Sequence, residues 1–216
     1  MLLPRPSAGR FPWAGALLPA AALGVGVAVL RLFTGGPHAL ALLAAVATPA
    51  LAAANARRAP AAVTLWVVAW LAHGLTAQLA AVGVIALAAV TIAEIASTLA
   101  PRRSLAVGLV LLAVLDIVLV WGTAQVEPAS TALHHVALPS AGGHPLPRLQ
   151  DATFGDATMG WLDLVAPALL GVVARSRFRA AIATGLAAGA WGLLLLVTSE
   201  VPATVPTLAG LLVGRL

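Results

Sequence analysis

Cysteine and lysine are both absent from this chain of 216 residues, and only 9% of its residues are charged. The lack of cysteine excludes a disulfide framework, a thiol nucleophile and a thiolate metal site. The low charge excludes an ordinary water-soluble domain, in which roughly a quarter of the residues are charged. Since every basic residue is arginine and alanine, glycine and proline are abundant, the composition also indicates a GC-rich, prokaryotic coding sequence.

Apolar residues are what the chain has in excess. They make up 61% of the sequence, and the mean hydropathy is +1.02. They occur in runs of about 20 residues separated by short polar breaks, which is typical of an all-α, polytopic membrane helical bundle. The eight candidate spans are Phe11–Phe33, His38–Ala56, Ala61–Ala80, Ala81–Ala100, Ser104–Ala124, Phe154–Ala174, Phe178–Ser199 and Val201–Gly214.

The arginines fall almost entirely on one side of an eight-span arrangement. Ten lie at the termini or in even-numbered loops, whereas only Arg31 and Arg148 lie on the other side. Cytoplasmic segments carry an excess of arginine, so this split predicts cytoplasmic termini and an extracytoplasmic loop 125–153. The pI of about 11.7 is explained by these span-end arginines without a nucleic-acid partner. We expect a multi-pass protein of the cell membrane.

Ionisable residues inside predicted spans are costly in lipid and therefore mark candidate functional sites. They are His73, Glu94, Asp116, Asp156 and Asp163. Asp116 precedes the outer end of the fifth span by eight residues, and Asp156 opens the sixth span on the same side, which predicts a similar depth for both carboxylates. Two such carboxylates can share a proton and hydrolyse a peptide bond as general base and general acid. Alternatively, each aspartate caps a helix or pairs with an arginine.

Three segments of the second half resemble the marks of presenilin and signal peptide peptidase, the intramembrane aspartyl proteases. That family carries Tyr-Asp in one span, Gly-x-Gly-Asp at the start of the next, and Pro-Ala-Leu in the last. The segment "LDIVLVWG", Leu115–Gly122, is similar to the first mark, with leucine in place of tyrosine. The segment "TFGD", Thr153–Asp156, is similar to the second, with threonine in place of the first glycine. The segment "PTL", Pro206–Leu208, is similar to the third, with threonine in the middle.

The resemblance implies that Asp116 and Asp156, 40 residues apart, are the catalytic dyad of an intramembrane protease. It implies supporting positions in the active site for Leu115, Thr153, Phe154, Gly155, Pro206, Thr207 and Leu208. The segment "HHVALP" is similar to an extended strand that faces the substrate in the family, which implicates His135, Val136, Ala137, Leu138 and Pro139. Two departures, Leu115 and Thr153, are compatible with an inactive relative. The family has nine spans, so this chain has one fewer, in the orientation of signal peptide peptidase.

The resemblance also implies a division of the chain. Residues 1–103 form an N-terminal scaffold of about four spans, and residues 104–216 form a presenilin-like catalytic half with the loop 125–153 and a Pro-x-Leu final helix. Membrane lipid and transmembrane-helix substrates are the expected partners, and no cofactor is expected. Asp163, seven residues after Asp156, lies on a similar helix face and is either a structural partner or part of the same cavity.

The loop 125–153 contains three histidines. His134, His135 and His144 are interpreted as exposed loop histidines rather than metal ligands, because their spacing is irregular.

Other functions remain open from the sequence. A prepilin-peptidase-like enzyme also uses membrane aspartates, although its lysine after the second aspartate is absent here. The non-enzymatic alternatives are an inactive protease-like scaffold and a small proton-coupled transporter, which is expected to show inverted repeats. No inverted repeat of the predicted spans is evident in the sequence.

Overall fold

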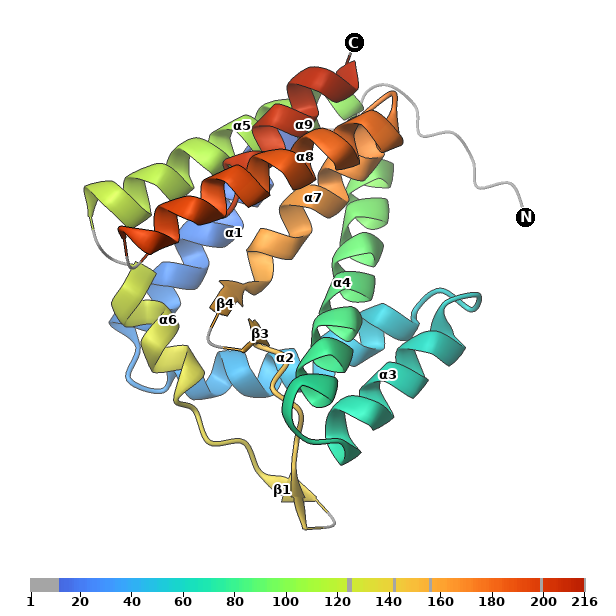
Figure 1. Ribbon diagram of the computed structural model, residues 1–216, viewed down its shortest axis with the longest axis vertical. Helices are drawn as coiled ribbons and strands as arrows, with labels where there is room; N and C mark the ends of the chain where they lie inside the picture. The colour runs from blue at the N-terminus through green and yellow to red at the C-terminus, as the bar shows by residue number, and fades with distance from the viewer. Residues whose placement is uncertain (1–11, 124–125, 142, 156, 199, 216) are drawn as a thin grey trace. The chain divides into compact units, whose positions relative to one another are not determined.

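The computed structural model of the protein describes residues 12–123, 126–141, 143–155, 157–198 and 200–215. These residues are predominantly helical, with two small antiparallel hairpins inserted in the second half (Figure 1). The helices are α1 Pro12–Leu32, α2 Gly36–Ala53, α3 Ala59–Leu71, α4 Gly74–Leu99, α5 Arg102–Ile117, α6 Val126–His134, α7 Trp161–Val173, α8 Arg177–Gly192 and α9 Pro206–Arg215. The strands are β1 Ser140–Ala141, β2 His144–Pro145, β3 Asp151–Phe154 and β4 Ala157–Gly160.

Four helical segments are long and apolar enough to cross a membrane. They are α2, α4, α5 with its continuation to Gly122, and α8 with its continuation to Leu196. Shorter apolar helices occupy Ala16–Leu32, α3 and α7. Within the segment Arg177–Leu196 only Ala180 is buried inside the protein, although the segment is apolar. Such an exposed apolar surface is suited to lipid rather than to water, and the chain is therefore described as a helical membrane protein.

The described residues divide into two compact units. The first, here called the α5 unit, contains residues up to Gly24, Ala93–Thr123 and the chain from Ala166 onward. The second, here called the hairpin unit, contains Val25–Ile92 and Ala124–Val165.

The α5 unit is organised around α9, which packs against both α5 and α8; the three helices lie side by side in Figure 1. Two glycines allow α9 to approach α8 closely. A Cβ at Gly210 would overlap the Thr184 hydroxyl and lie 2.8 Å from the Ala180 carbonyl oxygen. A Cβ at Gly214 would lie 2.8 Å from the Ala180 Cβ. Small residues at such interfaces let membrane helices pack by van der Waals contact, because lipid supplies no hydrophobic drive between helices.

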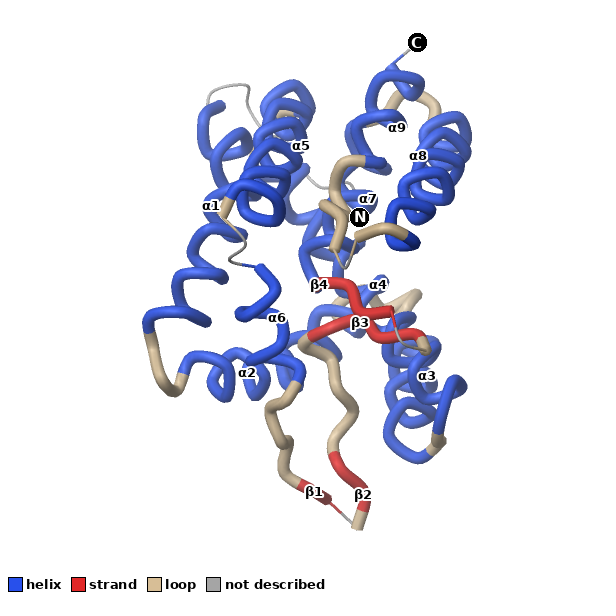
Figure 2. Tube along the Cα trace, turned by 60° about the vertical axis from the view of Figure 1, so that its left-hand side comes forward, coloured by secondary structure: helices blue, strands red, loops and turns tan. Residues whose placement is uncertain are grey.

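The hairpin unit has a core of mostly small apolar side chains. Its fully or almost fully buried members are Ala52, Ala62, Val84, Ile85, Ala88, Leu149 and Ala152. They come from α2, α3, α4 and the segment that leads into β3, so this segment is anchored by the helices. Figure 2 shows β1–β2 and β3–β4 as two separate hairpins. The β3–β4 pairing runs from Asp151 opposite Gly160 to Phe154 opposite Ala157.

Several boundaries differ from those that the sequence predicted. The third predicted span, Ala61–Ala80, is wrong at its end, because α3 stops at Leu71 and α4 begins at Gly74. Gly74 has a φ of +62°, which only glycine adopts readily, so the chain turns there. The last helix begins at Pro206 rather than Val201, with proline in the first helical position, where its missing N–H costs nothing.

The connection between the two predicted aspartate-bearing spans is also more structured than expected. The loop 125–153 contains the helix α6, the β1–β2 hairpin and most of β3. The predicted span Phe154–Ala174 is wrong at its start, because β3 and β4 precede a helix that begins only at Trp161. Pro128 is tolerated in α6 because it lies in the first turn, where an amide hydrogen has no partner inside the helix.

Candidate active site around Asp116

Asp116 lies on the buried face of α5. Leu105, Leu109, Leu112 and Asp116 follow one another at spacings of three or four residues, and all four are buried. This spacing keeps them on one side of an α-helix. Only 6% of Asp116 is exposed. The carboxyl group of Asp116 therefore lies in the interior of the α5 unit, because Asp116 occupies the buried face of the helix.

The carboxyl group of Asp116 is held by Thr204, 88 residues further along the chain. The Thr204 hydroxyl donates a hydrogen bond of 2.7 Å to Asp116 Oδ2, and the Thr204 backbone N–H donates a second of 3.1 Å to the same oxygen. Both residues are buried. A buried carboxyl group requires such donors, because its solvation by water has been lost.

The segment that carries Thr204 is not helical and is fixed by three further contacts. The Thr207 hydroxyl donates to the Thr204 carbonyl oxygen at 2.5 Å, and the Trp191 indole N–H donates to the Pro202 carbonyl oxygen at 3.0 Å. The ring of Trp191 contacts that of Trp121, with 5.8 Å between the ring centroids. These contacts from α8 and α9 hold the Thr204 peptide against α5.

The predicted Pro206–Leu208 motif thus contributes to the site indirectly. Pro206 and Thr207 are buried, and Leu208 is half-buried, in the first turn of α9. The Thr207 hydroxyl there donates a hydrogen bond to the carbonyl oxygen of Thr204. Thr204 and Trp191 were missed by the sequence reasoning. The pair of prolines at 202 and 206 signalled a break in the helix, but nothing in the sequence indicated which residue in the break meets Asp116.

The helix α5 changes geometry directly after Asp116. Val118–Gly122 forms a π-helical turn, and the Thr123 N–H donates to the Val118 carbonyl oxygen at 3.0 Å. Leu115, which stands at the tyrosine position of the motif that this segment resembles, is half-buried beside it. Single π-turns within α-helices are rare and are frequent at functional sites. The irregularity lies within one turn of the buried carboxyl group.

The second predicted motif begins in β3. Thr153 and Phe154 are the last two residues of this strand, so the threonine lies at a position where β-branched residues are favoured. Gly155 has a φ of +60°, and its N–H donates to the Gln78 side-chain oxygen of α4 at 2.9 Å. Gly155 therefore adopts a left-handed conformation that favours glycine. Asp156, the second predicted catalytic residue, lies outside the described residues.

The hairpin could have been recognised from the sequence. "DATFG" and "DATMG", residues 151–155 and 156–160, are a tandem repeat of five residues. Two short runs of this kind, with Gly-Asp between them, are a hairpin signal. The expected start of a membrane span at Phe154 hid this pattern.

Asp163 has a structural role at the start of α7. Its Oδ2 accepts a hydrogen bond of 2.8 Å from the Gly160 N–H, three residues earlier. This is the geometry in which an acidic residue at the third helical position caps the residue before the helix. The contact favours the structural interpretation of Asp163 over a place in the cavity.

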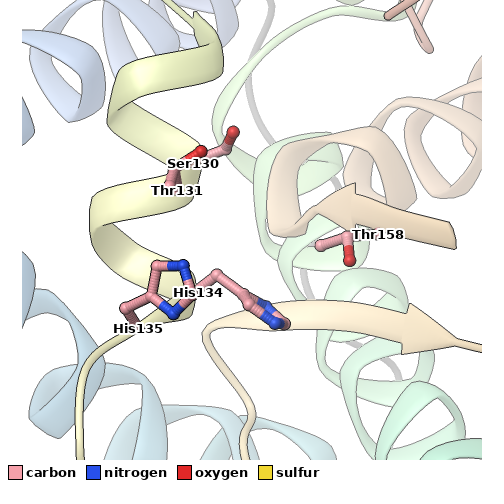
Figure 3. Close-up of a pocket in the computed structure, with 5 residues that line it drawn as sticks. All are labelled: Ser130, Thr131, His134, His135 and Thr158. Carbon is pink, nitrogen blue, oxygen red and sulfur yellow. The ribbon is translucent and has the colours of Figure 1, made fainter. Parts of the chain in front are cut away.

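The predicted substrate strand is not a strand. Residues 136–139 have no regular secondary structure, and His134 is the last residue of α6. His134 Nδ1 lies 2.7 Å from Asp151 Oδ2, so His134 is not a free loop histidine but links α6 to β3. Beside this pair is a cavity of about 180 Å³ lined by Ser130, Thr131, His134, His135 and Thr158 (Figure 3).

Comparisons of the chain with protein-family models, with curated proteins and with solved structures find no match. The function of the chain is therefore inferred from its own residues and their geometry. The buried Asp116 is the observation that carries most weight, because a carboxyl group in an apolar helix is expensive to maintain.

Proposed function

We propose that the protein is an intramembrane aspartyl endopeptidase, with Asp116 and Asp156 as its catalytic dyad. The observation that carries the proposal is the buried Asp116 in an apolar helix, oriented by two hydrogen bonds from a broken segment between α8 and α9. The order and spacing of the three motifs that resemble those of presenilin and signal peptide peptidase support it. In this proposal residues 104–216 are the catalytic half of an eight-span bundle in the cell membrane.

The chemistry requires one ionised and one protonated carboxyl group. The ionised carboxylate takes a proton from a water molecule, whose oxygen forms a bond to the scissile carbonyl carbon, while the protonated partner donates a hydrogen bond to the carbonyl oxygen. The tetrahedral intermediate then breaks its C–N bond, and the departing nitrogen takes a proton from the dyad. The products are a new carboxyl group and a new amine. Both bonds from Thr204 end on Oδ2 of Asp116, which leaves Oδ1 to face the water or the partner carboxyl group.

The substrate is proposed to be a transmembrane helix that reaches the dyad through the membrane. The backbone of a helix is closed to attack because its carbonyl groups are hydrogen-bonded within the helix. The substrate therefore has to unwind locally before cleavage. The described residues 197–198 and 200–205 are not helical, and the unwound part of the substrate is proposed to lie beside this break in the helices.

The test is hydrolysis of a helical membrane substrate by the purified chain in liposomes. Asp116→Asn and Asp156→Asn are each expected to lose cleavage as completely as the double variant, because members of a catalytic unit do not contribute additively. The side chain introduced by Asp116→Asn retains an oxygen that accepts both Thr204 bonds, so the fold should survive, as checked by thermal unfolding. Asp163→Asn is the matched control and should retain most of the activity.

Isotope-labelled water distinguishes peptide hydrolysis from other processes that remove the substrate. Hydrolysis in water enriched in oxygen-18 should place the label in the new carboxyl terminus of the product, detected by mass spectrometry. The rate should follow a bell-shaped pH profile, because the dyad works only with one proton bound. Cleavage by Asp156→Asn at the wild-type rate would end the proposal. Loss of activity only in Asp163→Asn would show that the second carboxyl group is a different one.

The two non-enzymatic interpretations give different results in the same system. An inactive scaffold leaves the substrate intact but binds it in wild type and both asparagine variants. A proton-coupled transporter acidifies or alkalises the lumen of the liposomes, which a trapped pH indicator measures. Neither result is compatible with peptide hydrolysis as the function of this site.

A further inference from the structure

A second site is suggested by a cavity on the outside of the hairpin unit. It has a volume of about 240 Å³ and is lined by Pro49 and Ala53 of α2 and by Ala62, Val63 and Trp66 of α3. Every lining side chain is apolar or aromatic. A dry apolar cavity of about 150 Å³ holds a molecule the size of benzene, so this one accommodates a segment of an acyl chain.

Two arginines stand on the turn directly next to this cavity. Arg57 and Arg58 lie between Ala53, where α2 ends, and Ala59, where α3 begins. The turn is held by Asn55, whose side-chain oxygen accepts from the Arg57 N–H at 3.0 Å and whose carbonyl oxygen accepts from the Arg58 N–H at 2.8 Å. The backbone that carries both arginines is thus fixed in the turn between the two helices that line the cavity, and the N-terminus of the 13-residue helix α3 adds partial positive charge there.

The indole ring of Trp66 forms one side of this cavity, here called the groove. Its ring contacts that of Trp70, one turn further along α3, with 5.4 Å between the centroids. Val63, on the rim, is 56% exposed, so the groove opens outward. The arginine distribution predicts that this turn is cytoplasmic, where anionic lipids are concentrated.

We propose that this groove binds one anionic phospholipid, with an acyl chain between α2 and α3 and the phosphate on Arg57 and Arg58. The charge of the turn selects the headgroup, since an acyl chain gains little by moving from lipid into an equally apolar groove. Each arginine is expected to contribute about fivefold to the preference for an anionic over a zwitterionic lipid, which corresponds to about 1 kcal/mol per basic residue. The site is independent of the proposed protease function.

Native mass spectrometry of the full chain in detergent tests the headgroup, with palmitoyl-oleoyl phosphatidylglycerol and the matching phosphatidylcholine as probes. Wild type should retain phosphatidylglycerol in preference. The double variant Arg57→Gln/Arg58→Gln should lose most of this preference, about fivefold per arginine. Arg102→Gln/Arg103→Gln removes an equal charge from an exposed pair on α5, a helix that does not line the cavity, and should keep the preference. Equal losses in both double variants, or no preference in wild type, would overturn the proposal.

Val63→Trp tests the groove itself by filling it from the rim. It should lower retention of both lipids, whereas unchanged binding of phosphatidylglycerol would mean that the arginines bind a phosphate without the groove, contrary to the proposal. Because the chain has no cysteine, Val63→Cys reports a protein occupant cleanly. A disulfide-linked dimer of this variant in membranes would show that a second copy covers the groove, and the lipid proposal would fail.

Discussion

The hydroxyl group of Thr204 is the contact at Asp116 that can be removed with least disturbance. Thr204→Val deletes the 2.7 Å hydrogen bond to Asp116 Oδ2 and keeps the β-branched shape of the side chain. The 3.1 Å bond from the backbone N–H and the contact of Thr207 with the Thr204 carbonyl oxygen involve main-chain atoms and should persist. The variant therefore isolates one donor to the candidate catalytic carboxyl group.

The magnitude follows from the kind of bond. A hydrogen bond to a charged group contributes about 1.5–3 kcal/mol, so its loss should lower kcat by about 10- to 150-fold if the bond orients Asp116 during hydrolysis. The effect on thermal stability should be smaller. Hydrogen bonds between membrane helices contribute on average about 0.6 kcal/mol and at most about 1.7 kcal/mol, because the partners find other contacts in the unfolded state.

The assay measures kcat and KM on a helical membrane substrate in liposomes, together with the unfolding temperature. Thr204→Ser retains the hydroxyl and should recover most of kcat. Thr98→Val removes a hydroxyl whose bond, 2.7 Å to the Ile95 carbonyl oxygen, lies on the exposed side of α4, and should change neither quantity. A fall in kcat with constant KM is expected for Thr204→Val. Wild-type kcat in this variant, or no recovery in Thr204→Ser, would refute a positioning role for the hydroxyl.

Three further results are expected. Gly210→Ala should destabilise the protein by about 1–3 kcal/mol, because its Cβ would lie 2.6 Å from Leu170 Cδ2 and 2.8 Å from the Ala180 carbonyl oxygen; Gly185→Ala, with open space around its Cβ, should leave the unfolding temperature unchanged or higher. Trp191→Phe keeps a ring beside Trp121 but loses the bond to the Pro202 carbonyl oxygen, so kcat should fall less than in Thr204→Val. A reporter fused after Gly143 should be extracytoplasmic and one fused at Arg215 cytoplasmic. Both on one side would show that an even number of spans separates them, so that the predicted count is wrong by an odd number.

The helices could be predicted because an apolar run long enough to cross a membrane has to satisfy its own backbone hydrogen bonds, which a helix does. Each of the eight predicted runs overlaps a described helix, although Ala61–Ala80 overlaps both α3 and α4, and only four of the described helical segments are long and apolar enough to cross a membrane. Their ends were less predictable where the turn is short. At Ala72–Gly74 the chain leaves the helix, and Gly74 adopts a positive φ, but apolar residues flank the turn and His73 was assigned to a span.

The elements that could not be predicted are those in which apolar and polar residues are mixed without a long apolar run. The helix α6 has no long apolar run; it buries Ala129 and half-buries Leu133, and the rest of the segment was read as a loop. The contact between Asp116 and Thr204 joins residues 88 positions apart, so no local pattern could indicate it. Motif spacing drew attention to Asp116 and to Pro206–Leu208, but the donor to the carboxyl group is Thr204, which lies in the non-helical segment before α9.

The contact at Asp116 has a structural as well as a proposed catalytic role, and two variants separate them. The Thr204 N–H and the Pro202 C=O are backbone groups of a non-helical segment, and their partners are the side chains of Asp116 and Trp191. A backbone group left unsatisfied in an apolar interior costs about 1–3 kcal/mol. Asp116→Ala should therefore lose both activity and that much stability, whereas Asp116→Asn, which keeps an acceptor oxygen, should lose activity alone. Equal unfolding temperatures for the two variants would mean that the broken segment does not depend on this carboxyl group for its fold.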